Sequence, residues 1–305
     1  MKIAVPDLVS NSYFPALAAV ELGCFEALGV KAEIALVFPP NRAYEALRSG
    51  EVDIVAASAH AAVSAFDQWK GVRLLCAQSR GMYWFLVVRS DLGIERGDLS
   101  GLKGLRIGAA PWVDLGLRGA LEQAGLDPER DGIDIGPIPK QPEAGSNFGL
   151  SAFRALEKGL IDGFWANGMA AELAVRHGVG NVVLDARRDD PAGCAGFTFP
   201  SVAASESRVL AEPELAGMVA SAVGRAHAEL RRDAGLAREI GARLFPSEEA
   251  GLIQGLIERD LPWYSTAITP ADFASMNAFL RRRGLLRDEP GFETVVCADA
   301  ARSRS

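Results

Sequence analysis

The sequence lacks the features that define several large classes of protein. Its four cysteines are far apart and form no CxxC pair, which argues against a disulfide framework or a zinc site. The formal net charge is −7, and basic residues are not clustered as nucleic acid or anionic lipid would require. No apolar run reaches the roughly 18 residues that span a bilayer. We therefore expect no metal, no nucleic-acid partner and no membrane span.

Motifs that carry a known catalytic mechanism are also missing. The sequence contains no GxSxG nucleophile elbow, no phosphate-binding P-loop, no GxGxxG turn and no HExxH helix. Its three histidines, His60, His177 and His227, are too scattered to suggest a metal cluster. We therefore expect no cofactor, and binding is favoured over catalysis.

The first residues do not form a secretory signal. Residues 2–5 already have the pattern of a short buried strand, and Pro6 ends it. The sequence fits a periplasmic protein whose export signal has been removed, and otherwise a cytoplasmic protein.

Short apolar runs alternate with amphipathic segments of helical length through the first two hundred residues. Repeated strand-helix-strand patterns predict parallel strands joined by right-handed helical crossovers, and hence doubly wound α/β lobes. The pattern restarts with a strand at 105–108, which indicates a second lobe. Beyond residue 210 helices predominate, with one more strand pattern at 293–296. The first lobe is expected to contain strands at 3–5, 31–38, 52–56 and 72–77 and helices at 14–28, 42–49 and 61–69.

An internal repeat links the two predicted lobes. Residues 43–53 match residues 152–162, and each stretch is predicted as a helix, a glycine in the left-handed C′ position, and a strand entered through aspartate. A small polar turn follows each copy, with Ser58 and Asn167 as natural N-caps. Coincidence is the alternative, because helix-glycine-strand turns recur throughout α/β proteins. A true repeat would place both turns at carboxyl ends of strands, where open α/β sheets bind ligands and helix N-termini favour anions.

Four segments in order carry a further pattern of glycine, aspartate and apolar residues. They are residues 21–33 (ELGCFEALGVKAE), 47–55 (LRSGEVDIV), 98–108 (DLSGLKGLRIG) and 155–164 (ALEKGLIDGF). Together they resemble the substrate-binding proteins of nitrate/sulfonate/taurine-type ABC importers, in the type II periplasmic-binding-protein superfamily.

The resemblance implies two type II lobes joined by two crossover strands, at 83–88 and 197–204, with a helical C-terminal tail. The expected boundaries are 1–84 with 200–305 for lobe one, and 85–199 for lobe two. It also implies a monomer that captures a small anionic organic ligand, such as a sulfonate or carboxylate, in a cleft between the lobes. The expected partners are the permease and ATPase subunits of an ABC importer.

Two alternatives remain open. The superfamily includes enzymes, so the chain can also be a cytosolic enzyme related to a pyrimidine synthase or a desulfinase. The pyrimidine synthase relies on a cysteine-rich segment that is missing here. The nucleophilic cysteine of the desulfinase is replaced in Ser10-Asn11-Ser12 by a serine, which forms no ready thiolate. A sensor domain of the LysR-effector kind is disfavoured because no helix-turn-helix precedes the first strand.

Candidate ligand-binding residues lie in the turns expected at strand ends. Arg42 can pair with a carboxylate, sulfonate or phosphonate, and Trp112 can stack on an organic ligand. Each candidate has a structural alternative: Ser12 and Asp114 as helix caps, or His60 as an ordinary hydrogen-bonded histidine. The full set is Asn11, Ser12, Tyr13, Arg42, Ser58, His60 and Arg80 in lobe one, Trp112, Asp114, Trp165 and Asn167 in lobe two, and Thr198 on the return crossover.

Overall fold

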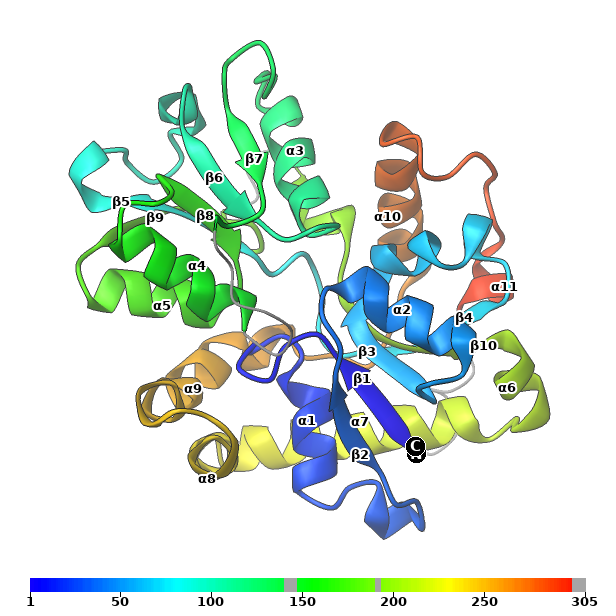
Figure 1. Cartoon of the computed structure of the whole chain (residues 1–305). Helices are drawn as coiled ribbons and strands as arrows, with labels where there is room; N and C mark the ends of the chain where they lie inside the picture. Colours follow the sequence, from blue (N-terminus) through cyan, green and yellow to red (C-terminus); the bar gives the residue numbers. More distant parts are fainter. Residues whose placement is uncertain (140–146, 190–192, 298–305) are drawn as a thin grey trace. The chain divides into compact units, whose positions relative to one another are not determined.

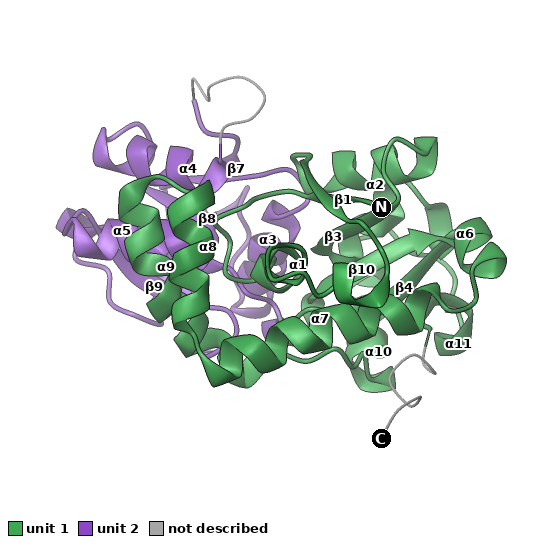
Figure 2. Ribbon diagram, turned by 90° about the horizontal axis from the view of Figure 1, so that it is seen from below, with its two compact units in different colours: residues 1–81, 196–305 green, residues 82–195 purple. Residues whose placement is uncertain are grey.

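The computed structural model describes residues 1–139, 147–189 and 193–297 (Figure 1). The chain divides into two compact units, which Figure 2 shows in different colours. Residues 1–81 and 196–305 belong to unit 1, and residues 82–195 belong to unit 2. Within the described ranges, no helix combines the length and the apolar character needed to cross a membrane.

Unit 1 is built on a five-stranded sheet in the order β2-β1-β3-β10-β4. β10 runs antiparallel to both of its neighbours, while β1, β2 and β3 pair in parallel. All five residues of β3 are buried, which accounts for the apolar run over its first four residues. The strands are β1 (Lys2–Val5), β2 (Glu33–Leu36), β3 (Ile54–Ser58), β4 (Val72–Ala77) and β10 (Pro200–Ser205).

The helices of unit 1 follow from right-handed crossovers. The chain moves one way along the sheet from β1 to β2 and the other way from β2 to β3, so α1 and α2 cover opposite faces. α7 packs against α1 and β4. The helices are α1 (Phe14–Glu21), α2 (Pro40–Ser49), α6 (Glu206–Ala211), α7 (Leu215–Arg232), α8 (Gly235–Leu244), α9 (Ser247–Asp260), α10 (Pro270–Arg282) and α11 (Phe292–Val295), with 3-10 turns η1 (Glu26–Leu28), η2 (Ala59–Ser64), η3 (Asp67–Trp69) and η7 (Leu261–Trp263).

Unit 2 repeats this topology with the order β7-β6-β8-β5-β9, in which β5 is the antiparallel strand. The connections from β7 to β8 and from β8 to β9 run in the same direction along the sheet, so right-handed crossovers place α4 and α5 on the same face. The two helices pack against each other there (Figure 1). The elements are β5 (Phe85–Arg89), β6 (Arg106–Ala109), β7 (Asp134–Gly136), β8 (Gly163–Ala166), β9 (Gly180–Asp185), α3 (Asp114–Gln123), α4 (Phe148–Glu157) and α5 (Gly168–Arg176), with 3-10 turns η4 (Ser90–Leu92) and η5 (Leu99–Leu102), and η6 (Cys194–Phe197) at the boundary with unit 1.

The internal repeat in the sequence is also a repeat in the structure. Gly50 and Gly159 take the expected left-handed backbone, with φ of 79° and 64°. The carboxylate of Asp53 accepts a hydrogen bond from the first backbone N–H of β1 at 2.6 Å. Asp162 accepts the equivalent bond from the first N–H of β6 at 2.9 Å. Each aspartate therefore ties the start of its strand to the parallel neighbour, and the predicted fold class of two doubly wound α/β lobes is confirmed.

Three predicted elements were wrong in detail. Residues 293–295 belong to helix α11, and only Val296 pairs as predicted, in an isolated parallel bridge with Leu74, because a four-residue segment is decided by its contacts more than by its β-branched composition. Residues 61–69 form the turns η2 and η3 instead of one helix, and Gln68 interrupts them with φ of 54°. The helix predicted over 14–28 ends at Glu21, just before Gly23 takes a left-handed φ of 68°.

Candidate functional site

The polar edge of unit 1 is the end of its sheet at which the parallel strands finish. Because β10 is antiparallel, it begins at the edge where β3 ends, and Pro200 pairs there with Ser58. The turns after β1, β3 and β4 and the segment before β10 therefore meet at one edge. The predicted residues carried by these segments are Asn11, Ser12, Tyr13, Ser58, His60, Arg80 and Thr198.

Several buried serines lie at this edge, and we call three of them the hydroxyl cluster: Ser10, Ser12 and Ser58. Each residue is at most 1 % exposed, and no hydrogen-bond partner for any of the three Oγ atoms exists among the described residues. The side-chain oxygen of Asn11 is also buried without a hydrogen-bond partner among the described residues. A buried polar atom left without a partner costs about 1–3 kcal/mol. These atoms are therefore suited to a partner from outside the chain.

Tyr44 of α2 lies at the end of β3. Its hydroxyl donates to the main-chain oxygen of Ser58 at 3.2 Å. Tyr44 is fully buried, and burial raises its pKa. The main chain at Ser58 is thus held by a buried tyrosine that stays neutral.

The N-terminus of α1 lies beside the cluster. Its N-cap residue, Tyr13, makes no side-chain hydrogen bond to the first turn, and Pro15 follows at the second helical position. The N–H of Ala16 donates to the side chain of Gln78 at 3.2 Å. An N-terminus without a capping side chain concentrates partial positive charge, which favours an anion.

Asn11 is held in place from the C-terminal helices. Its Nδ2 donates to the carboxylate of Asp260, the last residue of α9, and its main-chain oxygen accepts from the hydroxyl of Tyr264 at 2.6 Å. The ring of His227 in α7 stacks on Tyr264 with 5.1 Å between centroids. Sequence reasoning missed Asp260 and Tyr264, because no motif or spacing relates them to a turn about 250 residues earlier in the chain.

His60 and Thr198 form a buried pair. The Nδ1 atom of His60 lies 2.9 Å from Thr198 Oγ1, and the backbone N–H of His60 donates to the same oxygen at 3.4 Å. The imidazole also meets the edge of the Phe279 ring. The structure therefore gives His60 a structural role, and contact with a ligand stays a prediction.

The two predicted arginines of unit 1 are exposed. Arg42 pairs with Glu45 at 2.9 Å, and 67 % of its side chain is accessible. Arg80 directs a guanidinium nitrogen toward the main-chain oxygen of Pro262 at 3.4 Å. Neither side chain is buried with the hydroxyl cluster.

The equivalent edge of unit 2 holds the predicted tryptophans. Trp165 is fully buried, and its indole N–H donates to the main-chain oxygen of Val113 at 3.1 Å. This bond fixes the turn after β6, where the half-buried Trp112 has a left-handed φ of 70°. Such a conformation is strained for an aromatic residue, and strained residues of this kind cluster at functional sites.

The other two predicted residues of unit 2 have local structural partners. Asp114 is the first residue of α3 and pairs with Arg118 one turn later at 2.9 Å. Asn167 caps α5 by accepting the N–H of Ala170 at 3.0 Å. Asn167 thus has the capping role that its sequence predicted, whereas Asp114 lies one position inside its helix.

A buried arginine at the same edge was missed. Arg187 follows the end of β9 and is only 3 % exposed, which is rare for arginine. The backbone N–H of Arg187 donates to the Asp185 carboxylate at 3.2 Å. In the sequence, residues 185–189 look like an ordinary solvated run of charges, so no signal distinguished Arg187.

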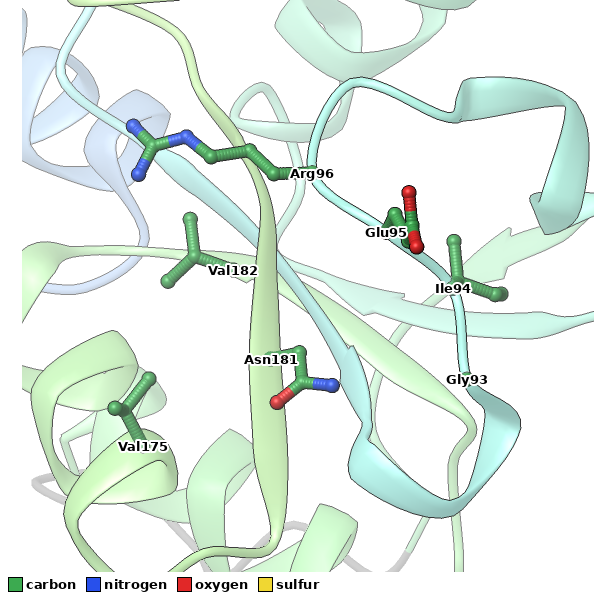
Figure 3. A pocket seen from close by; sticks show the side chains of 7 residues that line it. All are labelled: Gly93, Ile94, Glu95, Arg96, Val175, Asn181 and Val182. Carbon is green, nitrogen blue, oxygen red and sulfur yellow. The ribbon is translucent and has the colours of Figure 1, made fainter.

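Unit 2 also has a surface pocket of about 520 Å³ at the other end of β9 (Figure 3). It contains none of the predicted site residues. It is lined by Gly93, Ile94, Glu95, Arg96, Val175, Asn181 and Val182. In the part of the chain that the structure describes, no group of three or more histidine, cysteine, aspartate or glutamate side chains could hold a metal ion.

Residues 25–147 match the family described as "ABC transporter, phosphonate, periplasmic substrate-binding protein". None of the curated proteins compared matches the chain.

Several solved structures share the fold at low sequence identity. A protein of Bordetella bronchiseptica RB50 is 20 % identical with a TM-score of 0.78, and the match covers 99 % of this chain and 95 % of that one. The alkanesulfonate-binding protein SsuA of Xanthomonas axonopodis pv. citri, bound to MOPS, is 17 % identical with a TM-score of 0.72 and 98 % coverage of both chains. The desulfurization enzyme DSZB is 17 % identical with a TM-score of 0.65, covering 99 % and 97 %. The family match and the shared fold confirm that this chain resembles the substrate-binding proteins of ABC importers, as its four sequence segments indicated.

Proposed function

We propose that this protein is the substrate-binding component of an ABC importer and binds one small organic anion at the polar edge of unit 1. The observation that carries the proposal is the hydroxyl cluster of Ser10, Ser12 and Ser58, buried and without partners among the described residues. The matched family is described as phosphonate-binding, and one protein of the same fold binds alkanesulfonates. Phosphonates, sulfonates and carboxylates are the ligand classes that fit.

The chemistry of the edge suits such ligands. Phosphonate and sulfonate groups carry three acceptor oxygens, and serine hydroxyls and helix N–H groups are donors. Three hydroxyls and the N-terminus of α1 can therefore replace part of the hydration shell of the anion. These donors bind the anion without a side chain of opposite charge. We therefore expect the ligand to dissociate readily.

The proposal also covers the transport partners, the oligomeric state and the compartment of the protein. The protein delivers its ligand to permease and ATPase subunits, works as a monomer, and acts in the periplasm after removal of an export signal. Ligand-driven closure of the two units stays a prediction of the sequence resemblance.

Catalysis is the less favoured function, although the desulfurization enzyme DSZB shares the fold. A nucleophilic serine needs a general base hydrogen-bonded to its hydroxyl. Ser12, at the position that the desulfinase comparison singles out, has no hydrogen-bond partner on Oγ within residues 1–139, 147–189 and 193–297. We therefore propose that the bound molecule is released unchanged.

Two serine variants test the proposal. Ser12→Ala and Ser58→Ala are each expected to weaken binding of the best anion about 10- to 100-fold, because a hydrogen bond to a charged group contributes about 1.5–3 kcal/mol. The ligand-free variants should be as stable as the parent or more so, since each loses a buried hydroxyl without a partner. Calorimetric titration with ethylphosphonate, ethanesulfonate and propionate, together with thermal unfolding, measures both effects.

Ser64→Ala is the matched control. Its hydroxyl bonds to Ala61 O at 2.7 Å within η2, so affinity should not change. Absence of binding by all three anions would contradict the proposed function, and mass spectrometry showing a converted compound would favour an enzyme.

A further inference from the structure

We infer that the ligand carries an N–H or O–H donor beside its anionic group, and that Asp260 creates this requirement by orienting the side-chain amide of Asn11. The inference rests on the proposed function, since it concerns the same edge of unit 1. Asp260 would then be a positioning residue for specificity, acting from the end of α9.

The hydrogen bond to Asp260 fixes which way the amide faces. A carboxylate oxygen accepts, and Nδ2 is the only donor in the side chain of Asn11. Turning the amide over would place its carbonyl oxygen against the carboxylate, with two acceptors in contact. Asp260 is 1 % exposed, so water does not readily relieve that repulsion. Oδ1 of Asn11 is therefore held on the side away from Asp260.

This oxygen is the atom of Asn11 that is left to be satisfied. Nδ2 is engaged by Asp260, and the main-chain oxygen is engaged by the hydroxyl of Tyr264 at 2.6 Å. Oδ1 has no partner among the described residues, and Asn11 is 1 % exposed. An amide oxygen only accepts, so the group that completes it must be a donor.

The neighbouring atoms define where that donor sits in the ligand. Ser10 and Ser12 flank Asn11 in the same turn and offer hydroxyl donors to an anion, as does Ser58 across the edge. The carboxylate behind Asn11 polarises its amide and disfavours an anionic oxygen at Oδ1. The ligand therefore presents acceptors to the hydroxyl cluster and an ammonium, amide N–H or hydroxyl to Asn11.

A ligand without the donor leaves a buried acceptor unpaired, and sites of this kind discriminate strongly against such analogues. Matched pairs measure the discrimination directly. We would titrate the full chain with 2-aminoethylphosphonate against ethylphosphonate, and with 2-aminoethanesulfonate against ethanesulfonate. The aminated member of the pair that binds should bind at least about tenfold more tightly.

The variant Asp260→Asn tests the origin of the preference. An asparagine can offer either a donor or an acceptor to Asn11, so the Asn11 amide is no longer held in one orientation. The ratio of the two affinities should fall toward one. Tyr264→Phe is the matched control, because it removes the bond to the main-chain oxygen of Asn11 and leaves the bond to Asp260. It should weaken both members of a pair alike and keep the ratio.

The outcomes distinguish failure of this inference from failure of the proposed function. Equal affinity within each pair for the parent protein would overturn this inference and leave the proposed function standing. Failure of all four compounds and of propionate to bind would overturn the proposed function itself. A ratio that persists in a folded Asp260→Asn variant would remove Asp260 from its positioning role. The parent ratio needs no variant, so the donor requirement is decided even if Asp260→Asn does not fold.

Discussion

Trp165→Ala is expected to lower the free energy of unfolding of unit 2 by about 3–5 kcal/mol, the usual cost of removing a large buried aromatic side chain. Trp165 is fully buried and packs against Trp84 with 6.1 Å between ring centroids. Its loss would also leave the main-chain oxygen of Val113 without its indole donor. The cavity and the lost hydrogen bond act at one place, so the turn that carries Trp112 should loosen.

Native-state hydrogen exchange is the suitable measurement, because the chain has two compact units and need not unfold in one step. Protection should fall in β6, β8 and β5 and remain in the sheet of unit 1. Trp165→Phe keeps most of the ring volume and should cost about half as much or less. A change below about 1 kcal/mol for the alanine variant would contradict the packing described for Trp165.

Acidification is expected to destabilise unit 1 through His227. Burial, with the nearby Arg231 as a second cause, lowers the pKa of His227 from 6.5 to about 4. Between pH 6.5 and 4 the unfolded chain binds a proton at His227 that the folded chain does not, so stability decreases as the pH falls. At 1.36 kcal/mol per pKa unit, the loss from this one group is about 3 kcal/mol.

Urea unfolding at pH 7 and pH 4 measures this change, and His227→Gln removes it. The glutamine variant should lose about 3 kcal/mol less than the parent between the two pH values. His177→Gln is the control, because it makes the same substitution at an exposed histidine of unit 2. Identical slopes for the parent and His227→Gln would show that His227 is not buried in its neutral form.

Most of the fold follows from local patterns in the sequence. The duplicated helix-turn-strand unit could be identified from Gly50 and Gly159 and from Asp53 and Asp162. Glycine is the residue that adopts the left-handed conformation of such turns without steric cost. Those features are fixed by residues within one or two turns of each other. Helix α11 and the turns η2 and η3 were wrongly predicted, since tertiary contacts override weak propensities in short segments.

The residues of the candidate site that follow strands directly could be proposed from the sequence, whereas those brought in by tertiary contacts could not. Ser12 and Ser58 could be proposed from their places after strands, and the structure buries both. Asp260 and Tyr264 could not, because their relation to Asn11 exists only after α9 and η7 have packed on the turn. Arg187 was missed because burial of a charge cannot be recognised in a polar stretch of sequence.

The position of β10 dictates an order of events during synthesis. β10 is an interior strand, between β3 and the edge strand β4, yet it is the last strand of that sheet to leave the ribosome. All of unit 2 is encoded between β4 and β10. The inserted unit can therefore complete its own sheet while β3 and β4 still lack the strand that joins them. The first part of the chain to be made is then the last to finish folding.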